Sequence, residues 1–269
     1  MASVAVARRR SRFVADVLPV ILVLAGVVIV WQAVVMAFRI PTFLLPSPVA
    51  VANEFLSSPR FYLSNTAFTL STTIAGFFFA LVLGVTLALL IVSSRVLDKV
   101  LFTLLSSLHS VPKVALAPLL VIYLGTGVTQ KVVIAALIAV FTIVINTVVG
   151  LRSVDPEVLN MAYSKQASRL TILLKVRLPH ALPNLFGALK AATTFTLIGA
   201  IVGEFVAGEQ GLGYVILTAQ GAFDTPRAFV AVVILGLVGT ALFHLLAFVE
   251  RQVIPWHVSV RAERNRRPR

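Results

Sequence analysis

Cysteine is missing from this sequence of 269 residues, and charged residues are scarce. Without thiols the chain can form neither disulfides nor thiolate metal sites, and it has no cysteine nucleophile. Only 12% of the residues are charged and 59% are hydrophobic, against about 25% and about 45–50% in ordinary globular domains. So few charged residues cannot form the water-exposed surface of a soluble fold of this length. The composition therefore argues against a soluble enzyme, a disordered chain and a coiled coil.

Motifs for nucleotide binding and hydrolysis are missing as well. The sequence has no G-x-x-x-x-G-K-[ST] loop to hold phosphates, and neither H-E-x-x-H nor G-x-S-x-G occurs. The histidines lie in different segments, which argues against a metal cluster: His109, His180, His244 and His257. We expect a chain that is not an enzyme, holds no cofactor or metal, and cannot hydrolyse ATP by itself.

Long apolar runs are what the sequence has in abundance. A bilayer core about 30 Å thick needs about 20 apolar residues in a helix, and lipid tolerates no unpaired backbone groups. We predict an all-α polytopic membrane protein with six transmembrane helices, at residues 17–38, 66–92, 101–124, 132–151, 191–207 and 228–249. The third is interrupted by Pro112, Lys113 and Pro118, and the fifth is short and carries Glu204.

Basic residues are distributed unevenly between the connections. With the N-terminus inside, 18 of the 23 Lys and Arg residues lie on the inner side, in segments 1–16, 93–99, 152–190 and 250–269. Because basic residues favour the cytoplasmic side, we expect both termini in the cytoplasm. A basic N-terminus at 1–16 and a basic tail at 257–269 then flank a membrane domain at 17–256. The bias explains the net charge of +13 without nucleic acid, and the tail serves as a topology anchor or contacts anionic lipid headgroups.

The inner connection at 152–190 is the longest, and it contains two helix-start signals. Asp155 followed by Pro156 is typical of a helix N-terminus, and Ser168 can cap a second, amphipathic helix at 169–176. We expect Pro179 and Pro183 to end that helix. Short amphipathic helices of this kind either lie on the membrane surface or present an apolar face to a groove in another protein.

Small residues recur at helical spacing in two of the predicted spans: Gly76, Ala80, Gly84 and Ala88 in the second, and Gly199 and Gly203 in the fifth. Faces of small residues let membrane helices approach closely. We expect them to pack helices within one subunit rather than to form a specific dimer motif.

Residues 160–179 resemble the Glu-Ala-Ala-x-x-x-Gly-x₉-Ile-x-Leu-Pro motif of permease subunits of binding-protein-dependent ABC importers. The aligned residues are Asn160, Met161, Ala162, Gln166, Val176, Leu178 and Pro179. The end of the motif matches, whereas Asn160, Met161 and Gln166 depart from it. Four further stretches resemble the nitrate/taurine/alkanesulfonate group of these permeases: LLPSPVAV (44–51), VPKVALAPLLVIYLGTG (111–127), NTVVGLRSVDPEVL (146–159) and GEQGLGYVI (208–216).

The resemblance implies a type I ABC importer permease fold in a bacterial inner membrane, and a coupling segment at 152–190 that docks on a cytoplasmic ATPase. The coupling residues it implies are Asn160, Met161, Ala162, Gln166, Ala167, Ser168, Arg169, Leu178 and Pro179. The glycine of the family motif permits a tight turn, and Gln166 lacks that freedom.

The same resemblance implies the partners. They are two copies of the ATPase, which bind the ATP, a second permease copy, an extracytoplasmic solute-binding protein, and membrane lipid. The solute is then small, either nitrate-, sulfonate- or taurine-like or a vitamin precursor.

Candidates for the translocation path are the polar residues inside the spans: Lys113, Asn146, Thr193, Thr194, Thr196 and Glu204. Lys113 alternatively reaches the cytoplasmic surface, and Glu204 alternatively pairs with a basic residue or lies at headgroup level. Threonines in membrane helices also bond to their own helix. The alternative function is an ion-coupled secondary transporter or another six-helix membrane protein. A secondary transporter predicts related halves with paired broken helices, which we do not find.

Overall fold

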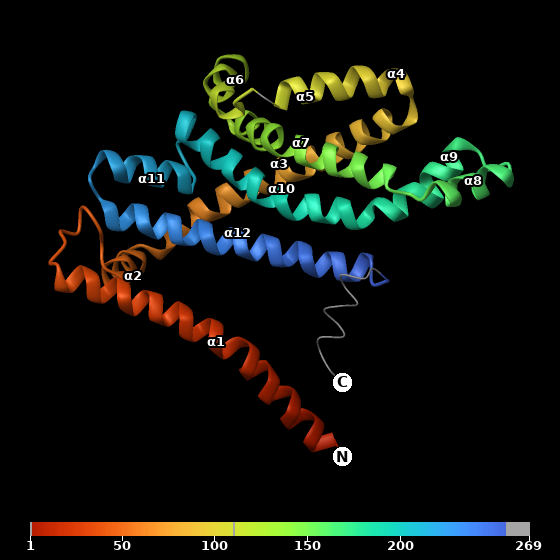
Figure 1. Ribbon diagram of the computed structural model, residues 1–269. Coiled ribbons are helices and arrows are strands. Elements are labelled where there is room, and N and C mark those ends of the chain that lie inside the picture. Colours follow the sequence, from red (N-terminus) through yellow and green to blue (C-terminus); the bar gives the residue numbers. More distant parts are fainter. Residues whose placement is uncertain (1, 110, 257–269) are drawn as a thin grey trace. The chain divides into compact units, whose positions relative to one another are not determined.

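The computed structural model describes residues 2–109 and 111–256, and in those ranges the chain consists of helices joined by turns (Figure 1). The chain divides by its contacts into two units. The first is Met1–Tyr62 with Ile216–Val232, and the second is Leu63–Val215 with Val233–Arg269. The predicted basic tail at 257–269 lies outside the described residues.

The first unit contains α1 (Ala2–Ala37), α2 (Pro48–Ser57), the start of α3 (Pro59–Ser93), and parts of α11 (Leu212–Gly221) and α12 (Thr225–Val253). Both α2 and α3 begin at a proline, where the missing N–H needs no partner. Ser47 caps α2 by accepting a hydrogen bond from the Ala50 N–H at 3.2 Å. The Tyr62 hydroxyl donates to Glu54 at 2.7 Å and so fixes the α2–α3 corner.

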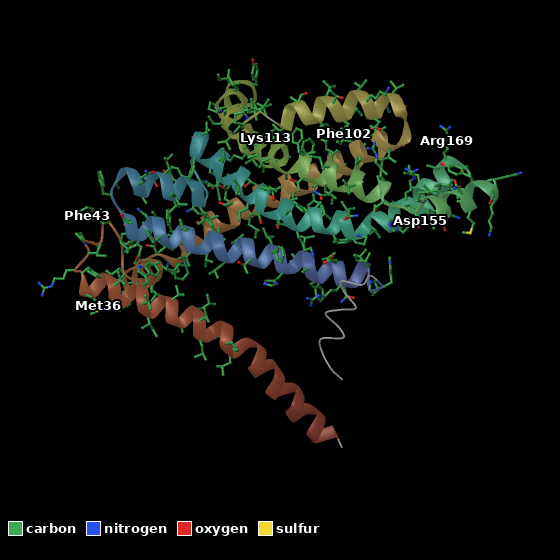
Figure 2. The ribbon with its side chains drawn as sticks, in the orientation of Figure 1. Met36, Phe43, Phe102, Lys113, Asp155 and Arg169 are labelled. Carbon is green, nitrogen blue, oxygen red and sulfur yellow. The ribbon has the colours of Figure 1, made fainter. Side chains whose placement is uncertain are left out.

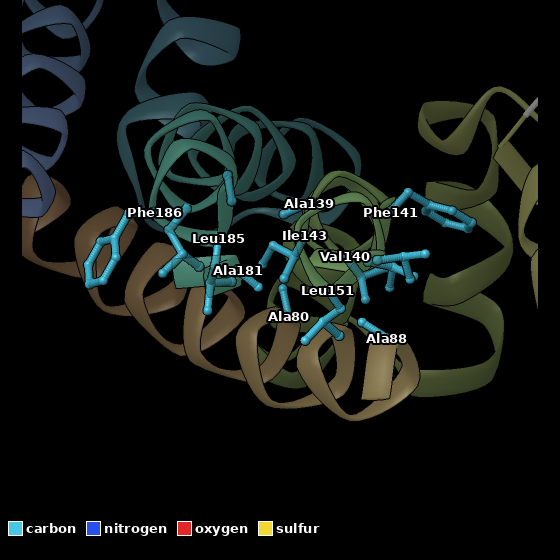
Figure 3. Packing of buried hydrophobic residues seen from close by; sticks show 14 of the residues in the cluster. Ala80, Ala88, Ala139, Val140, Phe141, Ile143, Leu151, Ala181, Leu185 and Phe186 are labelled. Atoms are coloured by element: carbon cyan, nitrogen blue, oxygen red, sulfur yellow. The ribbon is translucent and has the colours of Figure 1, made fainter. Parts of the chain in front are cut away.

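The second unit is organised around α7 (Val128–Arg152), one of the most buried of the long helices. Gly76 and Gly84 of α3 approach Ala135 and Ile143 of α7, so these two helices run parallel. On another side of α7, α10 (Leu178–Ala207) runs antiparallel, because Gly203 approaches Lys131 while Ala181 approaches Gly150. The expected packing of small residues within one subunit is therefore confirmed. Figure 3 shows the alanines and branched residues between the three helices.

Six apolar helical segments correspond to the six predicted spans. Four helices of the described chain are long and apolar enough to cross a membrane: Pro59–Ser93, Val128–Arg152, Arg169–Ala207 and Thr225–Val253. Two apolar segments are shorter, Ile21–Ala37 and Lys113–Leu124.

The third span is broken, as predicted from its prolines. The chain passes from α4 (Arg95–Leu97) through the π-helical η1 (Asp98–Phe102) into α5 (Thr103–His109). After Pro112 it resumes as the 3-10 helix η2 (Lys113–Leu116) and then α6 (Ala117–Leu124). Pro112 itself is extended, with ψ of 97°, so it separates the two halves.

The prediction that Pro179 and Pro183 end the second cytoplasmic helix is wrong. After α8 (Pro156–Ser164), α9 (Arg169–Ile172) leads through the π-helical η3 (Leu173–Arg177) directly into α10, giving one helical stretch of 39 residues, Arg169–Ala207. The Leu178 N–H bonds to the Leu173 carbonyl, five residues back. This π-helical turn shifts the pairing by one residue just before Pro179, and the helix continues past the proline.

Candidate functional site

The segment between α7 and α10, which is predicted to be cytoplasmic, is built from two capped helices. Asp155 accepts a hydrogen bond from the Glu157 N–H at 2.8 Å and begins α8, and Ser168 accepts one from the Thr171 N–H at 3.2 Å and begins α9. Both predicted caps are confirmed. Figure 2 shows Asp155 and Arg169 together, beyond the end of α7. Capping lets such short helices persist without a long hydrogen-bond ladder.

The turn between α8 and α9 is a Schellman motif with a glutamine at its left-handed position. The Ala167 N–H bonds to the Ala162 carbonyl at 3.2 Å, and the Gln166 N–H bonds to the Tyr163 carbonyl at 2.9 Å. Gln166 has φ of 56°, a conformation that glycine adopts at far lower cost. The chain thus forms the tight turn without the glycine of the motif, at the expense of local backbone strain.

The base of the segment is held by close contacts on both sides. A Cβ at Gly150 of α7 would lie 2.9 Å from Asn184 and 3.1 Å from Ala181 of α10, so the two stems touch. Arg152 at the end of α7 forms a salt bridge of 2.6 Å with Asp98 of η1. These contacts fix where the segment emerges, and they connect it to the α4–α5 region.

The tip of the segment exposes large apolar side chains. The exposed fractions are 57% for Met161, 51% for Tyr163 and 64% for Leu170. Val158 and Leu174 are exposed as well. A cluster of such residues on a cytoplasmic segment is typical of an interaction surface. Val158 and Tyr163 are five residues apart and so lie on different faces of α8, which is why helical spacing did not mark them in the sequence.

The other residues assigned to coupling surround this apolar tip. Asn160, Gln166, Ser168, Arg169 and Pro179 are exposed, whereas Ala162, Ala167 and Leu178 are half-buried. The half-buried alanines are the two residues joined by the Schellman hydrogen bond.

The six path candidates do not gather at one place. Thr193 and Thr196 are buried and donate to carbonyls of α10 itself, at 2.7 Å to Lys190 and 2.9 Å to Ala192. Asn146 and Thr194 are exposed, and the Asn146 amide donates to the Thr142 carbonyl at 2.8 Å. Lys113 is half-buried, with its ammonium 4.6 Å from the centre of the Phe141 ring.

Glu204 lies in a buried polar cluster. Its carboxylate accepts hydrogen bonds from the Thr69 hydroxyl at 2.8 Å and from the Gly213 N–H at 2.7 Å. The Thr69 oxygen accepts from the Leu212 N–H at 2.8 Å, and Asn65 accepts from the Gly211 N–H at the same distance. We call Asn65, Thr69, Glu204 and residues 211–213 the outer cluster, after the side of the membrane on which the distribution of basic residues predicts it. It joins α3, α10 and the first turn of α11.

Lys131 secures the neighbouring end of α7. It is buried, and its ammonium donates to the carbonyls of Thr126 at 2.8 Å, Gly127 at 3.2 Å and Ala207 at 3.0 Å. Ala207 ends α10, where a cation also interacts favourably with the helix dipole. This link to α10 could not be predicted from the sequence, because the Ala207 carbonyl lies 76 residues away from Lys131.

Comparisons with known proteins bear on these sites. Residues 80–255 match the family model described as binding-protein-dependent transport system inner membrane component. The chain is similar to the riboflavin transport system permease protein RibX of Chloroflexus aurantiacus, with 42% identity over 90% of each chain. It is also similar to the formylaminopyrimidine transport permease protein ThiX of Halalkalibacterium halodurans, with 29% identity over 80% of this chain and 86% of that one.

Solved structures show the same fold. The MetNI methionine ABC transporter in an inward-facing conformation has a chain that matches with a TM-score of 0.66 and 19% identity, covering 73% of this chain and 98% of the other.

Proposed function

This chain belongs to the family of inner-membrane components of binding-protein-dependent transport systems and is the permease subunit of an ABC importer, and we propose that its solute is riboflavin or a related flat nitrogen heterocycle. The observation that carries this substrate class is the 42% identity to a riboflavin permease across 90% of both chains. Relatives named for sulfonates, nitrate or taurine are 25–30% identical.

The exposed side of α10 fits a flat solute. Thr194, Phe195, Ile198 and Phe205 are exposed there, while the opposite face of the helix packs on α7. Aromatic rings stack on planar heterocycles, and a hydroxyl beside them can hydrogen-bond a ring nitrogen or carbonyl. This stripe, with Asn146 of α7, is the part of the translocation path that we assign to this chain.

A partner protein supplies the energy for transport. The apolar tip formed by Met161, Tyr163 and Leu170 docks on a cytoplasmic ATPase, which binds the ATP. Two ATPase subunits then serve two copies of this permease, and a solute-binding protein delivers the solute from outside. No catalytic step and no cofactor is assigned to the permease itself.

We place the chain in a bacterial inner membrane with both termini in the cytoplasm, as the distribution of basic residues favours. Because the chain has no cysteine, single cysteines report the topology directly. Leu44→Cys and Lys165→Cys, both at exposed positions, should react with an impermeant maleimide from opposite sides. Reaction of both from the same side would contradict the proposed orientation.

Uptake assays test the substrate class. The permease is expressed with its ATPase and binding protein, in cells that cannot otherwise take up riboflavin. We expect saturable uptake of labelled riboflavin, abolished when the Walker lysine of the ATPase is replaced. Uptake of labelled taurine or nitrate in place of riboflavin would overturn the proposal for the substrate and leave the permease assignment intact.

A further inference from the structure

We propose that Glu204 is a positioning residue for transport: it keeps the first turn of α11 joined to α3 and α10 throughout the transport cycle, so that these outer helix ends move as one body. The inference rests on the proposed function, because it concerns the motions of an ATP-driven importer. It gives a role to a buried carboxyl group that the sequence analysis placed in the translocation path.

Three successive backbone N–H groups at the start of α11 are bound by side chains of other helices. Those of Gly211, Leu212 and Gly213 are bound in turn by the side chains of Asn65, Thr69 and Glu204. The first N–H groups of a helix have no partner within the helix. Here side chains from α3 and α10 supply every one of these three partners. The start of α11 therefore depends on both helices for its hydrogen bonds.

Thr69 connects the parts of this arrangement. Its hydroxyl donates to Glu204 and its oxygen accepts from the Leu212 N–H, both at 2.8 Å. One hydroxyl therefore links α3 to α10 and to α11 at once. Thr69 is 1% exposed, and Glu204 and Leu212 are completely buried. Water does not reach these groups in this arrangement to replace a lost partner.

The glycines show how closely the backbone surrounds the carboxylate. A Cβ at Gly211 would lie 2.2 Å from the Glu204 carboxyl carbon, and one at Gly213 would lie 2.9 Å from its Oε2. Gly211 also has φ of 111°, which side-chain-bearing residues rarely adopt. The GEQGLG stretch at 208–213 is thus shaped around Glu204. No hydrogen-bond partner for it is needed from a solute.

Separation of these elements during transport would be costly. It would leave a carboxylate and several N–H groups unpaired in a buried site, where unsatisfied polar groups are expensive. Lys131 links α7 to the same group of helix ends, because its ammonium donates a hydrogen bond to the Ala207 carbonyl at the end of α10. The outer ends of α3, α7 and α10 with the first turn of α11 should accordingly shift together and not slide past each other.

The first experiment asks whether the outer cluster opens. Leu212→Cys is made in the cysteine-free chain and assembled with its ATPase and binding protein, with Gln210→Cys, an exposed position two residues earlier, as the control. A small maleimide should label Leu212→Cys at least about tenfold more slowly than Gln210→Cys, both without nucleotide and with ATP trapped. Labelling of Leu212→Cys at the control rate in either state shows that the cluster opens in the cycle and overturns the proposal.

The second experiment asks whether the cluster serves transport. Thr69→Val removes the linking hydroxyl, and Thr73→Val is the matched control, because Thr73 is equally buried on α3 and its hydroxyl donates to the Thr69 carbonyl of its own helix. We expect Thr69→Val to lower solute uptake per ATP hydrolysed by about fivefold or more, and to speed labelling of Leu212→Cys. Thr73→Val should change neither quantity.

A merely structural role would reduce the amount of folded complex without changing uptake per ATP. An unchanged ratio in Thr69→Val therefore overturns the proposal, and if that variant does not assemble, the labelling of Leu212→Cys in the otherwise unaltered chain decides. Failure of the unaltered chain to bind an ATPase would instead contradict the proposed function.

Discussion

The two ends of α10 differ in whether the groups there find their partners within this chain. At the C-terminal end, Glu204 is buried and both carboxylate oxygens accept hydrogen bonds. At the N-terminal end, the helix is preceded by a segment whose apolar side chains, Met161, Tyr163 and Leu170, are exposed. One end is complete within this chain. The other presents the kind of surface that another protein covers.

This contrast separates contacts within the chain from contacts with a partner. Substitutions in the outer cluster should weaken the fold itself as well as lower uptake per ATP hydrolysed, because its partners all come from this chain. Substitutions at the cytoplasmic tip should leave the isolated permease folded and affect its partner instead. The predictions below test that separation, beginning with the largest expected effect.

Gly211→Ala should be the most damaging single change. The added Cβ meets the Glu204 carboxyl group at 2.2 Å, and φ of 111° is unfavourable for alanine. We expect a loss of more than about 3 kcal/mol of stability, seen as a low yield and a much lower melting temperature in detergent. Gly221→Ala, near the other end of α11 with nothing within 4 Å of the added Cβ, should behave like the unaltered chain. Similar melting temperatures for the two variants would contradict this account.

At the apolar tip between α7 and α10, Ala162→Glu should strongly weaken ATPase binding without unfolding the permease. Ala162 is half-buried between the exposed Met161 and Tyr163 in the sequence, so a carboxylate there would be desolvated at the contact. The expected loss of affinity is about 100-fold, from about 2–3 kcal/mol, measured by co-purification and ATP-driven uptake.

Asn160→Glu is the matched control for this variant. It adds the same charge two residues away, at an exposed position where the family motif has glutamate. It should retain ATPase binding. If both variants bind equally well, the α8–α9 segment is not the docking element.

The sequence predicted features that depend on neighbouring residues. The break at Pro112 and the caps at Asp155 and Ser168 are confirmed, because each depends on a residue type acting within one helical turn. The small-residue faces around Gly76 and Gly199 are confirmed as well, since helical spacing alone places them on one side.

Other features depend on distant partners and could not be predicted in this way. Glu204 is bound by Thr69, which is 135 residues away in the sequence. The helix α11 lies in a stretch with several glycines, a composition typical of loops. Its first turn is held by side chains of other helices. The π-helical turn before Pro179 depends on how α10 packs. A prediction from the local propensity of proline therefore wrongly placed the end of the helix at Pro179. The functional roles of the coupling and path residues stay predictions.

Between the two ends, Glu250→Gln should have a moderate effect. Glu250 of α12 forms a 2.9 Å salt bridge with Lys190 of α10, with side-chain exposures of 11% and 24%. Loss of one charge should cost about 1–2 kcal/mol in thermal stability, since the pair is mostly shielded from water.

Asp98→Asn is the matched control for this variant. Its 2.6 Å partner is Arg152, and side-chain exposures of 37% and 43% allow water to screen the pair. This variant should cost less than about 0.5 kcal/mol. A larger effect for Asp98→Asn than for Glu250→Gln would show that the base of the cytoplasmic segment is more tightly built than its exposure indicates.

The smallest expected effect is a gain, from Gln166→Gly in the turn between α8 and α9. Gln166 has φ of 56°, and relief of this strain favours glycine by about 1 kcal/mol, partly offset by the greater freedom of glycine in the unfolded chain. Amide exchange at Gln166 and Ala167, whose N–H groups make the Schellman hydrogen bonds, should slow by up to about fivefold. Gln166→Ala removes the same side chain but keeps the left-handed strain, so it should give no gain. If alanine protects these amides as well as glycine does, the glutamine side chain and not the backbone limits the turn. Because the turn supports the exposed tip and lies outside the outer cluster, Gln166→Gly should leave labelling of Leu212→Cys unchanged.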